Sequence, residues 1–460
     1  MAIDLSVEIK TNRGVIALRN PLLNGASELA IDENTIKRCI DNGAGGVVTK
    51  SVGNATSPEL VKTTSRPWAF PLDRFGPEYR GAWVLQGMYF QSENTPEKVA
   101  EKRIPKWKKM CKEAGIPLIV SVADSEFDKW AYTGKLVEDA GADAIEICTS
   151  CPVAKQTHEQ GTEESKYSEG EFQDFDLAKK VIKSVMDATT IPVGAKFSLF
   201  HNPVDVMTRA WGDAGLCFIT GHDTLPSAGI FIDVEAEEVY GTPGQTLLIA
   251  GPTMLALSMS RLAQVLKASE KNIPVIGVGG IYKASDVIQY LLLGCTAVEV
   301  CSGAYFKGHK IFKELLEGLE DWMKRHGYTR IDQFRGKLFE DASCVKGDWE
   351  EKYGYKLEPS ERGMLLPDQN PSPILPKVDM KKCTLCDLCD DICVYGGIWV
   401  DHEKKTVEFN HDVCIGCGMC IGVCPENPGA LWLEDKRTNE VVWDGVGMVK
   451  SFKKGGFILD

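Results

Sequence analysis

Short apolar runs alternate with longer amphipathic segments through residues 1–340. Runs of strand length that are bounded by turn residues and separated by helical patterns are typical of a parallel sheet. The predicted strands are 21–26, 46–50, 118–122, 144–149, 193–198, 216–220, 275–279 and 297–301, with an accessory strand at 83–88. The intervals 51–115 and 221–272 are long enough to hold insertions or long loops.

The joints between these elements follow a common pattern. A helix ends at a glycine, one or two small residues follow, and a buried strand begins, as in Gly141-Ala142-Asp143-Ala144. Glycine accepts the left-handed conformation that ends a helix, and strands of parallel sheets are buried on both faces. Eight such strands in roughly 300 residues favour a (β/α)8 TIM barrel over an open, doubly wound α/β sheet.

Half of the 16 cysteines are concentrated in one short part of the chain, between residues 383 and 424. They form two runs spaced C-x2-C-x2-C-x3-C, namely Cys383, Cys386, Cys389, Cys393 and Cys414, Cys417, Cys420, Cys424. In two-cluster ferredoxins, the first three cysteines of a run bind one [4Fe–4S] cluster and the fourth binds the other. The first cluster is therefore expected at Cys383, Cys386, Cys389 and Cys424, and the second at Cys414, Cys417, Cys420 and Cys393. A zinc ribbon is the alternative, although it uses four ligands in two separated pairs.

These patterns divide the chain into parts. We expect the barrel at 1–340, a polar, proline-containing linker at 341–376, a domain with two [4Fe–4S] clusters resembling bacterial ferredoxins at 377–440, and a tail at 441–460. A length of 460 residues agrees with one large and one small domain.

Composition restricts the possible partners. Hydrophobic residues make up 43% of the chain and charged residues 25%, which is typical of a soluble protein. A net charge of −13 argues against binding to nucleic acid or to an anionic membrane. No secretory signal or bilayer-spanning run is visible, and clustered thiols fit a reducing compartment. We expect a cytoplasmic protein.

Chemistry in such a barrel takes place at the carboxyl ends of the strands. The pairs Gly279-Gly280 and Ser302-Gly303 follow the last two predicted strands, where this fold commonly binds phosphate, although a plain tight turn would also explain the glycines. Lys50 and Lys196 end apolar strands. Their side chains either extend to solvent at the rim or compensate an anion, such as the N1/O2 edge of a reduced flavin.

Several short motifs, taken in order along residues 5–435, resemble the dihydroorotate dehydrogenase family. The matching motifs are Asn20-Pro21, Ala26-Ser27, Thr49-Lys50-Ser51, Ser150-Cys151-Pro152, Ala195-Lys196, residues 276–281, Gly327-Tyr328 and residues 334–337. The domain order is most similar to that of the C-terminal half of dihydropyrimidine dehydrogenase.

The resemblance implies that the barrel binds FMN. Ala26, Ser27, Lys50 and Lys196 would line its ring, and Gly251, Gly279, Gly280, Ser302 and Gly303 would lie near its phosphate. Cys151 occupies the catalytic position of the family, where it would exchange a proton on the substrate face opposite the flavin. A thiol suits this role because its pKa lies near enough to neutrality.

Three positions differ from the pyrimidine enzymes of this family. Cys148 and Gly221-His222 stand where amide-bearing residues are expected, and Val153 replaces an Asn or His. A pocket without its matched hydrogen-bond partners loses discrimination for its substrate. His222 is a candidate for contact with a substrate carbonyl or carboxylate, although a structural loop histidine explains it at least as well. Gln86 and Cys148 are weaker candidates, because a buried cysteine is usually inert packing.

These observations predict an enzyme that acts on a C=C bond next to a carbonyl in a small cyclic substrate, with electrons passing between the clusters and FMN. One alternative is the catalytic subunit of a dihydropyrimidine dehydrogenase, acting on uracil and dihydrouracil. Another is an electron-transfer subunit without substrate chemistry. No dinucleotide-binding GxGxxG motif follows a strand, so we expect an oligomer in which an NAD(P)H- or FAD-binding subunit, or another redox protein, exchanges electrons with this chain.

Overall fold

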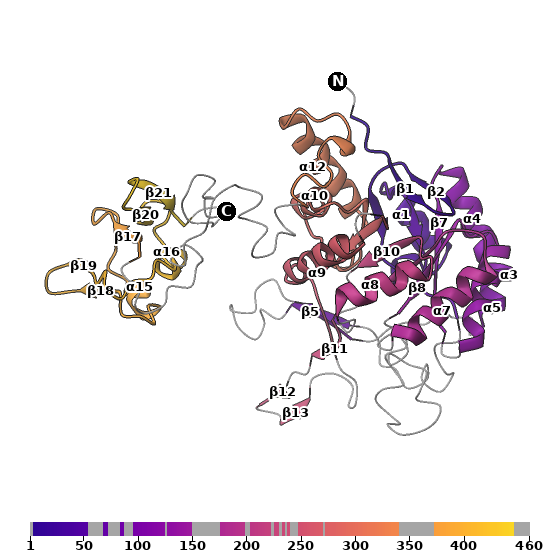
Figure 1. Ribbon diagram of the computed structural model, residues 1–460, viewed down its shortest axis with the longest axis horizontal. Helices are drawn as coiled ribbons and strands as arrows, with labels where there is room; N and C mark the ends of the chain where they lie inside the picture. Colours follow the sequence, from indigo (N-terminus) through magenta and orange to yellow (C-terminus); the bar gives the residue numbers. More distant parts are fainter. Residues whose placement is uncertain are drawn as a thin grey trace. The chain divides into compact units, whose positions relative to one another are not determined.

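The computed structural model consists of two compact units, Met1–Ser343 and Cys344–Asp460 (Figure 1). The residues described are 3–53, 68–71, 83–86, 95–124, 127–149, 175–197, 203–221, 225–229, 232–234, 237–239, 247–269, 272–339 and 372–445. None of the helices in these ranges has the length and apolar character needed to cross a membrane.

A parallel eight-stranded sheet forms the centre of the first unit. In spatial order its strands are β3 (Leu22–Asn24), β16 (Ala297–Val300), β15 (Val275–Val278), β10 (Phe218–Gly221), β9 (Val193–Lys196), β8 (Ala144–Cys148), β7 (Leu118–Val122) and β4 (Val47–Val48). A bridge between Leu23 and Gly46 brings the two ends of the sheet together. Each predicted strand is present with slightly different ends, and the predicted barrel is confirmed.

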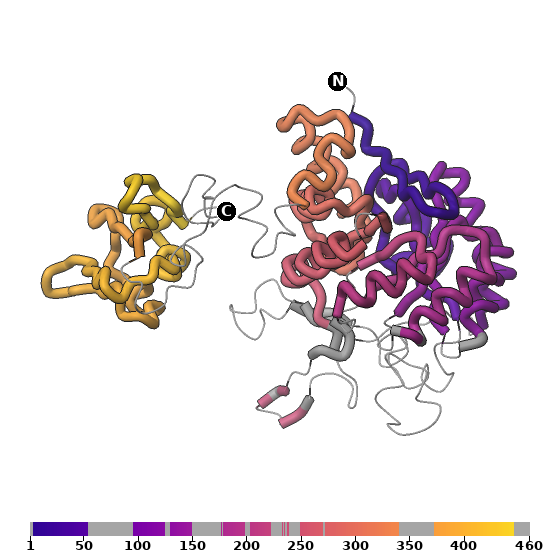
Figure 2. The backbone as a smooth tube through the Cα atoms, viewed as in Figure 1, coloured from indigo at the N-terminus to yellow at the C-terminus, as the bar shows by residue number. Residues whose placement is uncertain are grey.

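Helices surround this sheet (Figure 2). They are α1 (Glu33–Asp41), α3 (Pro96–Lys102), α4 (Ile104–Glu113), α5 (Phe127–Asp139), α7 (Phe175–Ala188), α8 (Val204–Asp213), α9 (Met254–Ala268), α10 (Ala284–Leu293), α11 (Ser302–Lys307) and α12 (Ile311–Arg325). Short 3-10 turns lie at Glu28–Ala30 and Ile331–Gln333. Successive helices pack against one another, as α5, α7, α8 and α9 do, so both faces of each barrel strand are covered.

The local sequence explains where these elements begin and end. Every residue of β7 and β8 is buried, as expected for strands between a filled barrel interior and a helical layer. Gly141, which follows α5 and precedes β8, has φ +107°, and Gly294 between α10 and β16 has φ +126°. A side chain is strained in this region, so the predicted Gly-to-strand joint has a direct conformational cause.

Additional strands lie outside the barrel. β1 (Val7–Thr11) and β2 (Gly14–Leu18) form an antiparallel hairpin, and β12 (Ile232–Asp233) pairs with β13 (Glu238–Val239). A four-stranded sheet has the order β11 (Leu225–Gly229), β14 (Leu247–Ala250), β6 (Trp83–Gln86) and β5 (Trp68–Pro71). β6 is the predicted accessory strand. The two long intervals of the barrel sequence therefore contribute strands to one shared sheet.

The second unit is a small, separate fold. β17 (Ile374–Val378), β20 (Leu431–Asp435) and β21 (Glu440–Trp443) form one antiparallel sheet, and β18 (Ile398–Asp401) pairs with β19 (Thr406–Phe409). The helices α15 (Leu388–Asp391) and α16 (Met419–Gly422) each begin within a cysteine run. Strands β17 and β21 extend beyond the interval 377–440 that we assigned to this domain from the sequence.

Candidate functional site

A cavity with about 470 Å³ of empty space lies at the carboxyl ends of the barrel strands. Its walls come from the last residues of β9, β14, β15 and β16 and from the segments that follow these strands and β3. They are Gly25, Ala26, Lys196, Ala250, Gly251, Met254, Val278, Gly279, Gly280, Ile281, Glu299, Cys301 and Ser302. Six of the predicted cofactor residues therefore meet in one place, namely Ala26, Lys196, Gly251, Gly279, Gly280 and Ser302.

Close backbone packing explains the glycines of this cavity. Gly280 has φ +71°, and a Cβ atom there would lie 2.4 Å from the backbone nitrogen of Leu255. A Cβ at Gly303 would lie 2.3 Å from the carbonyl oxygen of Ile281. Glycines that let the backbone approach closely at the ends of the last two barrel strands are the arrangement with which this fold binds phosphate. The observed residues thus fit a phosphate-bearing cofactor.

The Gly280→Ala variant should be less stable than the Gly327→Ala variant by about 1–3 kcal/mol, the usual cost of overpacking. Gly327 is the matched control, because it has φ +73° and no atom within 4 Å of an added Cβ, whereas Gly280 has φ +71° and a crowded Cβ position. Both substitutions place a side chain at nearly the same positive φ, so their difference reports crowding. Denaturant unfolding measures it, and equal losses would contradict the close approach at Gly280.

Lys196 lies between two buried carboxylates at the cavity. Its Nζ is 3.0 Å from Oε1 of Glu146 and 2.9 Å from Oε2 of Glu299. The exposed fractions are 4% for Lys196, 0% for Glu146 and 1% for Glu299. Of the two orientations considered from sequence, the structure shows the buried one. Burial raises the pKa of Glu299 well above its ordinary value, the charge of Glu146 raises it further, and Lys196 opposes both effects.

Lys50 has a different environment. It is 8% exposed, and its Nζ lies 3.4 Å from Oε1 of Glu28, a residue of the 3-10 turn after β3. The hydroxyl of Tyr305 donates to the other carboxylate oxygen of Glu28. Ser27, the residue before, donates its hydroxyl to the Gly25 carbonyl at 2.9 Å. Lys50 and Ser27 are thus held by neighbouring residues of the β3 end and are not among the residues that line the cavity.

Sequence reasoning missed Glu146 and Glu299. Each is the single carboxylate of a strand whose other residues are apolar, as in Ala144-Ile145-Glu146-Ile147 and Ala297-Val298-Glu299-Val300. A charged residue in the middle of a fully buried strand requires a partner, so this pattern was the signal available. The sequence provides no indication that both carboxylates share Lys196.

Of the residues predicted for catalysis and substrate contact, only Cys148 has a described side chain. Cys151 and His222 fall outside the described residues, and Gln86 belongs to β6, whose side chains are not described. Cys148 is buried at the end of β8 and pairs in register with Lys196 on β9. Their roles stay predictions.

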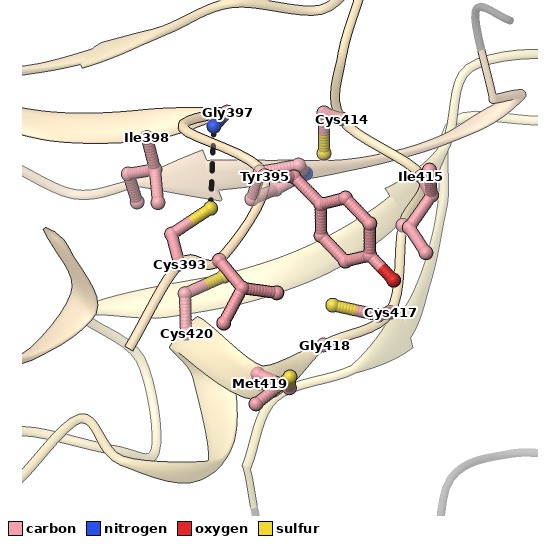
Figure 3. A pocket seen from close by; sticks show the side chains of 13 residues that line it. Cys393, Tyr395, Gly397, Ile398, Cys414, Ile415, Cys417, Gly418, Met419 and Cys420 are labelled. Carbon is pink, nitrogen blue, oxygen red and sulfur yellow. Dashed lines mark hydrogen bonds between the residues drawn. The ribbon is translucent and has the colours of Figure 1, made fainter. Parts of the chain in front are cut away.

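A second cavity, with about 390 Å³ of empty space, lies in the cysteine-rich unit. Figure 3 shows thiols from both runs directed into it, Cys414, Cys417 and Cys420 from the second run and Cys393 from the first. Three cysteines of the second run and the fourth cysteine of the first run therefore surround the same space, as crossed ligation requires. For the other predicted set, burial raises the pKa of Cys424, and the nearby Cys386 and Cys383 raise it further. The fourth cysteine of each run therefore lies near cysteines of the other.

The two runs share one backbone conformation. Leu385 and Asp387 have φ of 56° and 64°, and the equivalent Gly416 and Gly418 have φ of 72° and 76°. Left-handed residues at alternate positions turn the chain tightly around the space that the thiols face. In the described part of the chain, no three His, Cys, Asp or Glu side chains converge as ligands of a single metal ion. Thiolates in runs of this spacing are the ligands of iron–sulfur clusters, whereas a zinc ribbon uses four ligands in two separated pairs.

Comparison with known proteins identifies a family for each unit of the chain. The family model for dihydroorotate dehydrogenase matches residues 9–323, and a model for the 4Fe-4S dicluster domain matches residues 375–425. The chain belongs to the dihydroorotate dehydrogenase family, as the sequence motifs predicted. It is an oxidoreductase acting on CH–CH groups that carries an additional iron–sulfur domain.

Three relatives illustrate the range of this family. The catalytic subunit of dihydroorotate dehydrogenase B (NAD(+)) from Pyrococcus furiosus is 25% identical over 335 residues, 72% of this chain and 98% of the relative. Dihydropyrimidine dehydrogenase (NADP(+)), chloroplastic, from Arabidopsis thaliana is 25% identical over 343 residues, 72% of this chain and 76% of the relative. Dihydroorotate dehydrogenase (fumarate) from Saccharomyces cerevisiae is 25% identical over 331 residues, 69% of this chain and 94% of the relative.

Proposed function

We propose that the protein is an FMN- and iron–sulfur-dependent oxidoreductase that acts on a C=C bond next to a carbonyl in a cyclic substrate. One observation carries the proposal: a glycine-walled cavity with a buried lysine, at the catalytic end of a family barrel, occurs in the same chain as a dicluster domain. FMN, when bound, would supply hydride transfer, and clusters would supply single electrons.

The cavity residues divide between the two ends of such a cofactor. Gly279, Gly280 and Ser302 follow the last two barrel strands and would hold the phosphate through backbone N–H groups. Ala26 and Lys196 line the same cavity from the ends of β3 and β9 and would contact the ring. Two carboxylates set the position of Lys196. Lys196 would therefore orient the edge of the ring on which negative charge develops.

Cys151 would give a proton to the substrate carbon next to the one that receives hydride, or remove it in the reverse direction. Its place follows β8, whose last residue is Cys148. β8 ends beside Lys196 of β9, so the chain leaves this strand on the cofactor side of the barrel. That position supports a role for the following residues in handling substrate.

Two clusters would form a route for electrons between the barrel and a second protein. Eight cysteines in two runs supply the ligands, Cys383, Cys386, Cys389 and Cys424 for one cluster and Cys414, Cys417, Cys420 and Cys393 for the other. The Pyrococcus furiosus relative is named as a catalytic subunit that uses NAD(+). We infer a comparable division here, with a nicotinamide- or FAD-binding subunit or another redox protein as the electron partner.

Substrate preference should separate this protein from pyrimidine reductases. Cys148 and Gly221-His222 replace residues expected to read amide edges, and each lost hydrogen bond in a buried site costs roughly 1–3 kcal/mol. Two or three such losses, about 2–9 kcal/mol in total, weaken binding by roughly 30-fold to 10⁶-fold. Anaerobic titration of the reduced protein should therefore show prompt flavin reoxidation by cyclic enones and little by uracil at equal concentration.

Each other outcome of this titration has a distinct meaning. Reoxidation by uracil at micromolar concentration would identify a dihydropyrimidine dehydrogenase and contradict our interpretation of the pocket. A flavin that reacts with neither class of compound, but exchanges electrons with a redox protein, would identify an electron-transfer subunit. The Cys148→Asn variant is the matched test of specificity, because restoring one amide should improve uracil reoxidation and leave the response to enones nearly unchanged.

A further inference from the structure

The buried cluster at the cavity has more carboxylates than cations. Glu146 comes from the middle of β8, Lys196 from the end of β9 and Glu299 from β16, on the far side of β10 and β15 in the sheet. Lys196 contacts both carboxylates, at 3.0 and 2.9 Å. Glu146 is enclosed, whereas Lys196 and Glu299 also line the cavity. The cluster therefore extends from the barrel interior, at Glu146, to the cavity, at Lys196 and Glu299.

The charge of this cluster depends on a single proton. With both carboxylates ionised, one ammonium leaves a net negative charge in a desolvated site, which is unfavourable. With one carboxyl protonated, the cluster is neutral and its members can hydrogen-bond to one another. The like charge of Glu146 makes Glu299 hold a proton more strongly than an isolated carboxylate does. Of the two carboxylates, Glu299 is the one that lines the cavity.

The elements packed around Glu299 differ in the titratable groups that they carry. The strands β3 and β15 that flank β16 carry no ionisable side chain. On α10, which packs against β16, Asp286 accepts from the backbone N–H groups of Tyr282 and Lys283, and Tyr290 donates to the carbonyl of Gly279. Cys301, two residues beyond Glu299, lines the same cavity. Glu146 and Lys196 both act on the charge of Glu299, and Nζ of Lys196 lies 2.9 Å from its carboxylate.

We propose that Glu299 is a proton-accepting positioning residue, which takes up a proton when negative charge arrives on a cofactor in the cavity and releases it on oxidation. The proposal rests on the proposed function, because it requires FMN in the barrel. Two electrons come from reduced iron–sulfur clusters of this chain. One solvent proton goes to the cofactor and a second to the Glu299 carboxylate, and reoxidation returns both.

The physical reason is charge neutrality in a buried site. An added negative charge near Lys196 repels an ionised Glu299 in a medium of low dielectric constant. Protonation of Glu299 removes that repulsion and leaves Lys196 paired with Glu146 on one side and with the cofactor on the other. The effect is present at pH values where Glu299 is ionised in the oxidised protein and protonated in the reduced protein. It disappears at lower pH, where Glu299 is protonated in both states.

The test is the pH dependence of the FMN midpoint potential in the full-length protein, from mildly acidic to alkaline pH. Each additional proton bound changes the reduction equilibrium tenfold per pH unit, about 30 mV for a two-electron couple. The native protein should show this additional slope and the Glu299→Gln variant should lack it. Glu28→Gln is the matched control, because it neutralises the carboxylate partner of the other strand-end lysine, Lys50, and should keep the native slope. Equal slopes in the native protein and Glu299→Gln would overturn the proposal.

Two further measurements do not depend on the folding of that variant. Glu146→Gln leaves Glu299 with Lys196 as its only charged partner in the cluster, so Glu299 should stay ionised and the additional slope should be lost there too. An infrared difference spectrum of the native protein should show the C=O stretch of a protonated carboxyl appearing on reduction. A retained slope in Glu146→Gln, or a native protein without this band, would overturn the proposal. A native protein that binds no FMN would instead overturn the proposed function and this inference with it.

Discussion

The Cys151→Ala variant should keep its FMN and iron–sulfur clusters but turn over substrate roughly 10²–10⁴ times more slowly, the usual contribution of a positioned acid or base. The reason is that hydride transfer from one face of a C=C bond leaves the neighbouring carbon in need of a proton from the opposite face. Steady-state turnover with a cyclic enone, together with flavin and iron content, measures both parts of this prediction. Cys151→Ser should retain more activity than Cys151→Ala at high pH.

Cys295→Ala is the matched control for this variant. Cys295 is a fully buried thiol that precedes β16, at the end of the barrel opposite the cavity. Its removal costs packing energy without touching the site, so turnover per bound flavin should stay near the native value. Native turnover in Cys151→Ala would mean that another residue transfers the proton, with His222 as the first candidate.

The Cys393→Ser variant should lose the cluster held by the second cysteine run and keep the other, so that iron falls from about eight to about four atoms per chain. Cys393 belongs to the first run but lines the cavity formed by Cys414, Cys417 and Cys420 (Figure 3). Replacing a thiolate ligand by a hydroxyl weakens binding because iron–sulfur clusters are held by cysteine thiolates. Iron and acid-labile sulfide analysis measures the loss, and electron paramagnetic resonance of the reduced protein identifies the cluster that remains.

Cys424→Ser provides the reciprocal experiment. It should remove the other cluster, so the spectra of the two variants should complement each other. Val394→Ala is the control for local disturbance, because Val394 follows Cys393 and is 77% exposed. It should keep both clusters. If Cys393→Ser and Cys386→Ser lost the same cluster, each run would bind its own cluster and crossed ligation would be wrong.

Local pattern was sufficient to predict the barrel and the cysteine-rich domain. A strand such as β7 is apolar at every position except Ser121 because both of its faces are buried, and that pattern is visible in five consecutive residues. The cysteine runs are equally local, because the three-residue spacing places successive thiols around one small volume. Secondary structure and ligand spacing depend on neighbours in the chain, so the sequence by itself determined both.

Tertiary structure decided which distant residues meet. Lys196 was recognisable as a strand-end lysine, but Glu146 and Glu299 lie 50 and 103 positions away in the chain and reach it only because the barrel closes. The sheet formed by β5, β6, β11 and β14 likewise joins two separate intervals of sequence. Contacts of this kind depend on how the strands are ordered and staggered around the barrel. No local pattern encodes that order, and so the charge of the cluster at the cavity became visible only in the folded chain.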